Sequence, residues 1–283
     1  MIAVESRPPS ELDGICRIIR KHIISQTTRA GSGHPTSSLS GVELLVALYF
    51  GGYLRHNAKQ PHDPGRDRFI LSKGHAAPLL YSVLAHAGYF PTEQLNTLRK
   101  IGSPLEGHPN MRRLAGVEAS TGSLGQGLSL GIGHALATRL DTLPAHIFVM
   151  LGDGEMDEGQ VWEAAMAAVK FGLDRLIAIV DVNGYQQTGS TTDVLDLKPL
   201  APRWQGFGWN VMEIDGHNMR QIQVALERAT ASRGRPTVIL AHTIKGYPIQ
   251  NLLGNDPNHH GKPLTEEQAK RAIREIETQT IVL

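Results

Sequence analysis

The chain has 283 residues, of which 28 are basic and 27 acidic, so its formal net charge is +1. This length suits one large α/β domain or two smaller ones, and the balanced charge gives no field that favours nucleic acid or a membrane surface. Cys16 is the only cysteine, which excludes an intrachain disulfide and favours an intracellular, cytoplasmic protein. We expect no signal peptide and no membrane span, because the longest apolar stretch is short and contains Glu43.

Hydrophobic spacing predicts mostly helices in the first half of the chain. Apolar residues recur at helical intervals from Leu12 to Ile23, Ser10 with Asp13 resembles a capping box, and Gly31 is expected to end this helix. Further elements are predicted as a buried helix at 41–50, a strand at 68–72, a helix at 76–89, a loop at 101–122 and a glycine-rich helix at 124–140. Because glycine lowers helix propensity, these glycines indicate close packing against a neighbour or a ligand.

The second half alternates between strands and helices. Strands are predicted at 146–151, 175–182, 209–215 and 236–243, and helices at 159–171, 219–231 and 265–277, with a loop from 183 to about 199. Fully apolar strands that alternate with helices indicate a parallel sheet covered on both faces. The sequence therefore predicts a single α/β domain over residues 1–283, with a doubly wound, mostly parallel sheet.

An acidic turn, "GDGEMDEG", directly follows the apolar run that ends at Leu151. Asp153 lies in this turn, and Asn183 follows the next strand, 30 residues further on. Ligands bind beyond the carboxyl ends of parallel strands, so both side chains are expected at one crevice. Their hard oxygen atoms suit Mg²⁺, with Ca²⁺ as a substitute, and Gly152 and Gly154 would let a diphosphate approach the backbone. The alternative is an ordinary strand-to-helix turn with acidic residues at a helix start.

Several stretches together resemble one enzyme family. "GDGEMDEGQVWEA" followed by "IVDVNGYQQTG" is similar to the thiamine diphosphate motif, in which Gly-Asp-Gly is followed after a spacer by Asn. "AGSGHPTSSLSGVELL", "DRFILSKGHAAPLLYSVLAHAGYF", "EGHPNMRRLAGVEASTGSLGQGLS" and "HTIKG" with "HHGKPLT" match, in order, the N-terminal, diphosphate-binding half of transketolase. The chain therefore resembles this half in a transketolase that is split between two polypeptides.

The resemblance implies a set of cofactor contacts. Mg²⁺ would be held by the side chains of Asp153 and Asn183 and by the main-chain carbonyl of Tyr185. Thiamine diphosphate would be bound at His75, Gly122, Ser123, Leu124, Gly152, Asp153, Gly154, Glu158 and Asn183. His242 and Lys245 follow the end of a strand and are also expected to reach the diphosphate. The other carboxylates of the acidic turn, Glu155 and Asp157, are interpreted as turn and helix-start residues.

Four histidines lie in separate loops beside glycine or proline: His34, His75, His108 and His260. Histidine donates, accepts and transfers protons near neutral pH, and a sugar needs several such partners at once. Taken singly, each could be an ordinary loop residue. The resemblance implies that they line the channel to the thiazolium carbon and contact the donor ketose, with His34 and His260 as the first candidates.

The resemblance also implies an incomplete active site. In this family the glutamate that protonates the aminopyrimidine, and the residues that hold the acceptor's phosphate, lie on a pyrimidine-binding domain that the sequence does not contain. We therefore expect a separate C-terminal subunit, an α2β2 heterotetramer, and transfer of a two-carbon ketol unit from a sugar or sugar phosphate. The alternatives are a subunit of a 2-oxoacid dehydrogenase or decarboxylase, a subunit from specialised metabolism, and a non-catalytic cofactor-binding partner.

Overall fold

A five-stranded parallel sheet forms the centre of the molecule. The computed structural model describes residues 7–249 and 259–278. All pairings are parallel, in the order β1-β2-β3-β5-β4, and the strands are β1 Arg68–Leu71, β2 Ile147–Gly152, β3 Leu176–Val182, β4 Asn210–Asp215 and β5 Thr237–His242. The central strands are apolar and buried because helices cover both of their faces. The predicted α/β class and parallel sheet are confirmed.

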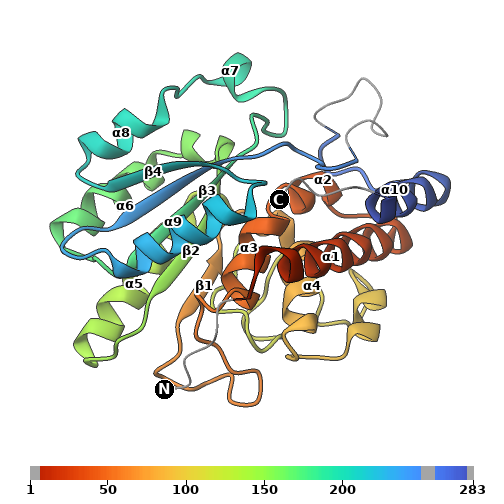
Figure 1. The fold of residues 1–283 in the computed structure, drawn as a ribbon, viewed down its shortest axis with the longest axis horizontal. Helices are drawn as coiled ribbons and strands as arrows, with labels where there is room; N and C mark the ends of the chain where they lie inside the picture. The colour runs from red at the N-terminus through yellow and green to blue at the C-terminus, as the bar shows by residue number, and fades with distance from the viewer. Residues whose placement is uncertain (1–6, 250–258, 279–283) are drawn as a thin grey trace.

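Helices form a layer on each face of the sheet. One layer contains α1 Pro9–Ala30, α2 Pro35–Leu39, α3 Val42–Phe50, α4 Ala77–His86, α9 Met219–Ala231 and α10 Glu266–Thr278. The other contains α5 Gln126–Leu140, α6 Gly159–Lys170 and α8 Leu200–Gly206. In Figure 1, α1, α4 and α10 gather on one side of the sheet, with α5, α6 and α8 on the other. Shorter helical segments are α7 Thr191–Val194 and the 3₁₀ turns η1 Gly74–Ala76, η2 Thr92–Thr97 and η3 Gly154–Asp157.

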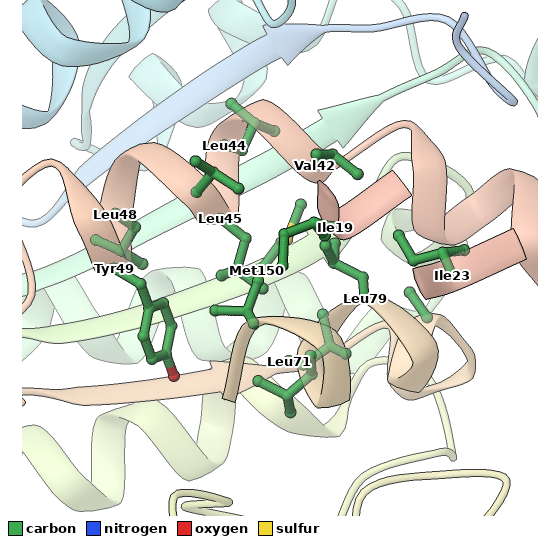
Figure 2. Close-up of a cluster of buried hydrophobic side chains, with 14 of the residues drawn as sticks. Ile19, Ile23, Val42, Leu44, Leu45, Leu48, Tyr49, Leu71, Leu79 and Met150 are labelled. Carbon is green, nitrogen blue, oxygen red and sulfur yellow. The ribbon is translucent and has the colours of Figure 1, made fainter. Parts of the chain in front are cut away.

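The larger apolar core lies between the sheet and the layer that contains α1. Figure 2 shows Ile19 of α1, Leu45 of α3 and Leu79 of α4 near Met150 of β2, with Ile23 further along α1. Helix α3 is apolar along almost its whole length, so it is buried on all sides except at its end. This packing fixes the carboxyl ends of β1 and β2 relative to the loop between α1 and α2.

The structure corrects one predicted feature and adds several. Ser10 and Asp13 form no capping box, because α1 starts at Pro9 after Pro8 and has no side-chain cap, whereas Gly31 ends the helix in the left-handed conformation as expected. Helices α2, α7 and α8 were not predicted. Helix α8 contains a proline and a glycine, which obscure the helical spacing of its apolar residues. Burial of Trp204 against the sheet stabilises this helix.

The glycines of α5 allow close contact with the sheet. A Cβ atom on Gly131 would lie 2.5 Å from a methyl group of Val149 and 3.2 Å from one of Leu176. The prediction that this glycine-rich helix packs closely is therefore confirmed. No helix within residues 7–249 and 259–278 combines the length and the apolar character needed to cross a membrane.

Candidate active site

A cavity of about 390 Å³ opens at the carboxyl edge of the sheet. Loops that follow β1, β2 and β3 line it, together with the loop between α1 and α2, the long loop before α5 and the segment before α10. The lining residues are His34, Ser37, Lys73, His75, His108, Gly122, Leu124, Gly152, Asp153, Gly154, Glu155, Asn183, Tyr185, Gln186, Gln187 and His260. The cavity thus brings together the four predicted histidines and the predicted metal ligands.

Asp153 and Asn183 meet at the floor of this cavity. The amide of Gly184 donates to Oδ2 of Asp153 at 2.6 Å, and the amide of Gly154 donates to Oδ1 at 3.0 Å. Oδ1 of Asn183 accepts from the amide of Tyr185 at 3.1 Å, while its Nδ2 donates to Asp181 at 3.3 Å. Asp153 and Asn183 follow the neighbouring strands β2 and β3 and line the same cavity.

The charges at this floor fit a divalent cation. Asp181 is fully buried and ion-paired with Lys73, whereas the carboxylate of Asp153 is held by two backbone amides. Burial and the nearby Asp181 carboxylate raise the pKa of Asp153 to about 6. A bound cation would offset both effects, because it favours the ionised carboxylate. The residues present supply one carboxylate, one amide oxygen and a main-chain carbonyl, a set that phosphate oxygens of a ligand would complete in the manner typical of Mg²⁺.

Glycines keep the walls of the cavity open for a phosphorylated ligand. A Cβ atom on Gly154 would lie 2.6 Å from Cβ of Gln186, and one on Gly74 would lie 2.8 Å from the amide nitrogen of Gly122. Gly122 has a φ of 152°, and a Cβ atom there would lie 3.1 Å from the ring of His108. Close approach of these loops leaves backbone amides and Lys73 near the cavity, which suits an anion.

Three imidazole rings gather at one wall. The ring centroids of His34 and His75 are 5.1 Å apart, those of His34 and His260 4.9 Å, and those of His75 and His260 5.3 Å. Nδ1 of His34 is buried and has no hydrogen-bond partner in the part of the chain that the structure describes. Residues more than two hundred positions apart therefore form one polar cluster.

These imidazoles are held in the neutral form. Burial, followed by the nearby positive charge of Lys245, lowers the pKa of His260 to about 3. Burial and the charge of Arg99 lower the pKa of His34 to about 4. Burial and the charge of Lys73 also lower the pKa of His75. Nζ of Lys245 lies 3.0 Å from Nδ1 of His260, so the ammonium donates to an unprotonated ring nitrogen.

His108 lies at the mouth of the cavity. Its side chain is exposed, and partial burial together with Arg99 lowers its pKa. The hydroxyl of Tyr81 donates to the main-chain carbonyls of Glu106 and His108, at 3.0 and 3.1 Å. This buried tyrosine therefore anchors the loop that carries the histidine.

The structure places some predicted cofactor residues outside the cavity. Ser123 and Glu158 are exposed and do not line it, although Cβ of Glu158 packs against Gly125. His242 is exposed and lies 2.9 Å from Glu213 on the edge strand β4. Lys245 is buried behind His260. His242 does not line the cavity.

Sequence reasoning did not select five lining residues: Ser37, Lys73, Glu155, Gln186 and Gln187. Lys73 and Ser37 stand within the "SKGHA" and "SGHPTSS" stretches, beside histidines that were selected, so their position was a usable signal. Glu155 was interpreted as a turn residue, yet it is buried and its carboxylate accepts three hydrogen bonds.

The parallel α/β sheet is that of the thiamine diphosphate-binding folds, since solved transketolase structures superpose on nearly the whole chain. Residues 13–279 match the family model described as "Transketolase, thiamine diphosphate binding domain". The chain therefore belongs to the transketolase family, and its function is of the transketolase type.

Similar proteins include separate subunits and full-length enzymes. The chain is 46% identical over 272 residues to the 6-deoxy-6-sulfo-D-fructose transketolase subunit SqwG of Clostridium sp. (strain MSTE9), covering 95% of this chain and 97% of that protein. It is 38% identical to an apulose-4-phosphate transketolase subunit of Phocaeicola vulgatus, covering 91% of this chain and 90% of that protein. The transketolase structure from Campylobacter jejuni superposes with a TM-score of 0.87 at 32% identity, covering 96% of this chain but 43% of that one.

Proposed function

We propose that this chain, together with a partner subunit, transfers a two-carbon ketol unit from a ketose donor to an aldose acceptor, with Mg²⁺ and thiamine diphosphate as cofactors. The observation that supports this most is the convergence of His34, His75 and His260 above the Asp153–Asn183 floor. Neutral imidazoles suit a polyhydroxylated substrate, because each ring both donates and accepts hydrogen bonds.

The floor of the cavity would hold the cofactor. Asp153, Asn183 and the carbonyl of Tyr185 would bind Mg²⁺, and backbone amides near Gly122 and Gly154 would bind the diphosphate. When bound, thiamine diphosphate supplies a carbanion and then acts as an electron sink. Lys73 is held by Asp181 and would add positive charge beside the phosphates.

The wall of the cavity that is formed by His34, His75 and His260 would bind the sugar. His34 lines the cavity and would bind a donor hydroxyl or carbonyl. His260 accepts from Lys245 at one ring nitrogen, which orients the other nitrogen toward the cavity wall that it shares with His34. His108 at the mouth would contact hydroxyls further along the sugar. Their lowered pKa values keep these rings neutral at neutral pH, so each can donate one hydrogen bond and accept another.

A partner subunit would complete the site. Two of the similar proteins are subunits of nearly the same length as this chain, whereas full-length transketolase is more than twice as long. One face of α5 is exposed, and its residues are Gln126, Leu130, Gly133, Ala137 and Leu140. This α5 stripe is mostly small or apolar, so we propose that it lies in the interface of an α2β2 assembly.

A binding titration and a donor panel test this proposal. The chain with its partner should bind thiamine diphosphate only when Mg²⁺ is present, and should then cleave a ketose. Fructose 6-phosphate, xylulose 5-phosphate and 6-deoxy-6-sulfofructose are informative donors, because related subunits are named for sulfonated and phosphorylated ketoses. Tight cofactor binding without turnover of any ketose, but with turnover of a 2-oxoacid, would contradict the proposal.

A further inference from the structure

Glu155 joins three loops that line the active-site cavity. Its side chain is 2% exposed although it directly follows the Asp153–Gly154 turn. Oε1 accepts from the hydroxyl of Ser72 at the end of β1, and also from the amide of Gly125 at 2.9 Å. Oε2 accepts from the amide of Gly152 at 3.0 Å. One carboxylate therefore contacts the segments after β1, before α5 and at the end of β2.

The contact with Ser72 extends this connection into α5. Oγ of Ser72 accepts from the amide of Gly127 at 3.1 Å while its hydroxyl proton goes to Glu155. Gly125 has a φ of 82°, so the chain turns sharply there before α5 begins. The last loop residues before this turn include Gly122 and Leu124, which line the cavity.

Each of the three segments carries residues that face the proposed cofactor. The segment after β1 carries Lys73 and His75, the loop before α5 carries Gly122 and Leu124, and the end of β2 carries Gly152 and Asp153. A buried carboxylate that accepts three hydrogen bonds holds its donors strongly, since hydrogen bonds to a charged group exceed neutral ones. The spacing of the three segments then depends on one side chain.

We propose that Glu155 is a positioning residue that sets the spacing of the three cofactor-binding segments. This inference rests on the proposed function, because it concerns the same cavity. A role in positioning, unlike a role in overall stability, requires that loss of the carboxylate loosens these segments locally and weakens cofactor binding in a chain that stays folded.

The test compares Glu155→Gln and Ser72→Ala with the control Glu227→Gln, which alters an exposed carboxylate on α9. Glutamine keeps the size of the side chain, but its amide nitrogen cannot accept from Gly152. Hydrogen exchange of the chain alone should become about tenfold faster in peptides that cover 122–127 and 150–154, with peptides from α1 and α4 unchanged. Ser72→Ala removes one donor and should accelerate exchange mainly over 122–127.

Cofactor affinity is the second measurement. In the presence of the partner and Mg²⁺, Glu155→Gln should raise the dissociation constant for thiamine diphosphate about tenfold, whereas Glu227→Gln should leave it unchanged. Unchanged hydrogen exchange in both Glu155→Gln and Ser72→Ala would overturn the positioning role, and so would faster exchange with unchanged affinity. A wild-type pair that fails to bind thiamine diphosphate would contradict the proposed function instead, and hydrogen exchange of the chain alone would still decide the role of Glu155.

Discussion

At the scale of single residues, the chemistry of the site depends on where charge is left uncompensated. Lys73 is ion-paired with Asp181, whereas Asp153 is held by two backbone amides, and burial together with the Asp181 carboxylate raises the pKa of Asp153 to about 6. The histidines show the opposite arrangement, because burial and nearby cations keep their rings neutral. The site therefore combines one buried carboxylate, the proposed metal ligand, with a neutral polar wall, the proposed sugar-binding surface.

Substitution of Asp153 tests the metal position. Asp153→Ala should lower Mg²⁺-dependent affinity for thiamine diphosphate by about a hundredfold or more, because it removes the charged ligand. Calorimetric titration of the reconstituted pair measures this loss. The neighbouring carboxylate offers a matched control: Asp157→Asn, which alters a half-buried contact with Gln186, should change the affinity by less than about threefold. Equal losses in the two variants would count against the assignment.

Substitution of His34 separates substrate binding from cofactor binding. His34→Ala should leave the dissociation constant of thiamine diphosphate within about twofold while it lowers ketose turnover by about a hundredfold, as expected for a group that acts in proton transfer and hydroxyl binding. Steady-state kinetics at a saturating cofactor concentration measures the ketose turnover. A parallel loss of cofactor affinity would place His34 at the cofactor rather than at the sugar.

The lowered pKa of His34 also predicts a pH dependence of stability. Its pKa falls from an ordinary value of about 6.5 in the unfolded chain to about 4 in the folded one. Folding therefore favours the neutral ring, so this stabilising contribution is complete above about pH 6.5 and is lost as the pH falls toward 4. Denaturant unfolding at several pH values measures how far the free energy of unfolding falls as the pH is lowered. This decrease should be smaller for His34→Gln than for the wild type. Identical pH dependence would contradict the buried, neutral state.

At the scale of secondary structure elements, the strands were predictable and the shorter helices were not. Continuous apolar runs such as the one in β3 leave few alternatives to a buried parallel strand. Helix α8 escaped prediction because burial of Trp204, not local pattern, decides it. The placement of Asp153 and Asn183 at one crevice could be predicted because each residue follows the end of a parallel strand. The contact of His34 with His260 depends on the paths of two loops, which no local sequence pattern encodes.

Helix α5 has two faces, and its glycines test them separately. A Cβ atom on Gly131 would meet Val149 at 2.5 Å, but one on Gly133 would meet nothing within 4 Å. Gly131→Ala should therefore lower the free energy of unfolding by about 1–3 kcal/mol through overpacking. Gly133→Arg should leave the free energy of unfolding of the chain within about 1 kcal/mol of the wild type and yet prevent its association with the partner.

Denaturant unfolding measures the free energy of unfolding of both variants, and light scattering measures whether the Gly133→Arg variant associates with the partner. Normal assembly of the Gly133→Arg variant would show that the α5 stripe lies outside the interface.

At the scale of the whole molecule, the central proposal is that the chain supplies one half of a cofactor site. Its cavity brings together the residues proposed to hold the metal, the diphosphate and the sugar, and the chain aligns with less than half of a full-length transketolase. Its cytoplasmic location, the α2β2 stoichiometry and the identity of the donor stay predictions. The cavity opens at the carboxyl edge of the sheet, where a second domain would cover it.

Ketose turnover by the chain with and without its partner tests the central claim most directly. Both samples contain Mg²⁺, thiamine diphosphate, a ketose donor and an aldose acceptor, and the product aldose is measured. We expect turnover from the pair and at least a hundredfold less, on the order of background, from the chain alone, because the group that activates the cofactor would come from the partner. Full turnover by the chain alone would contradict this account.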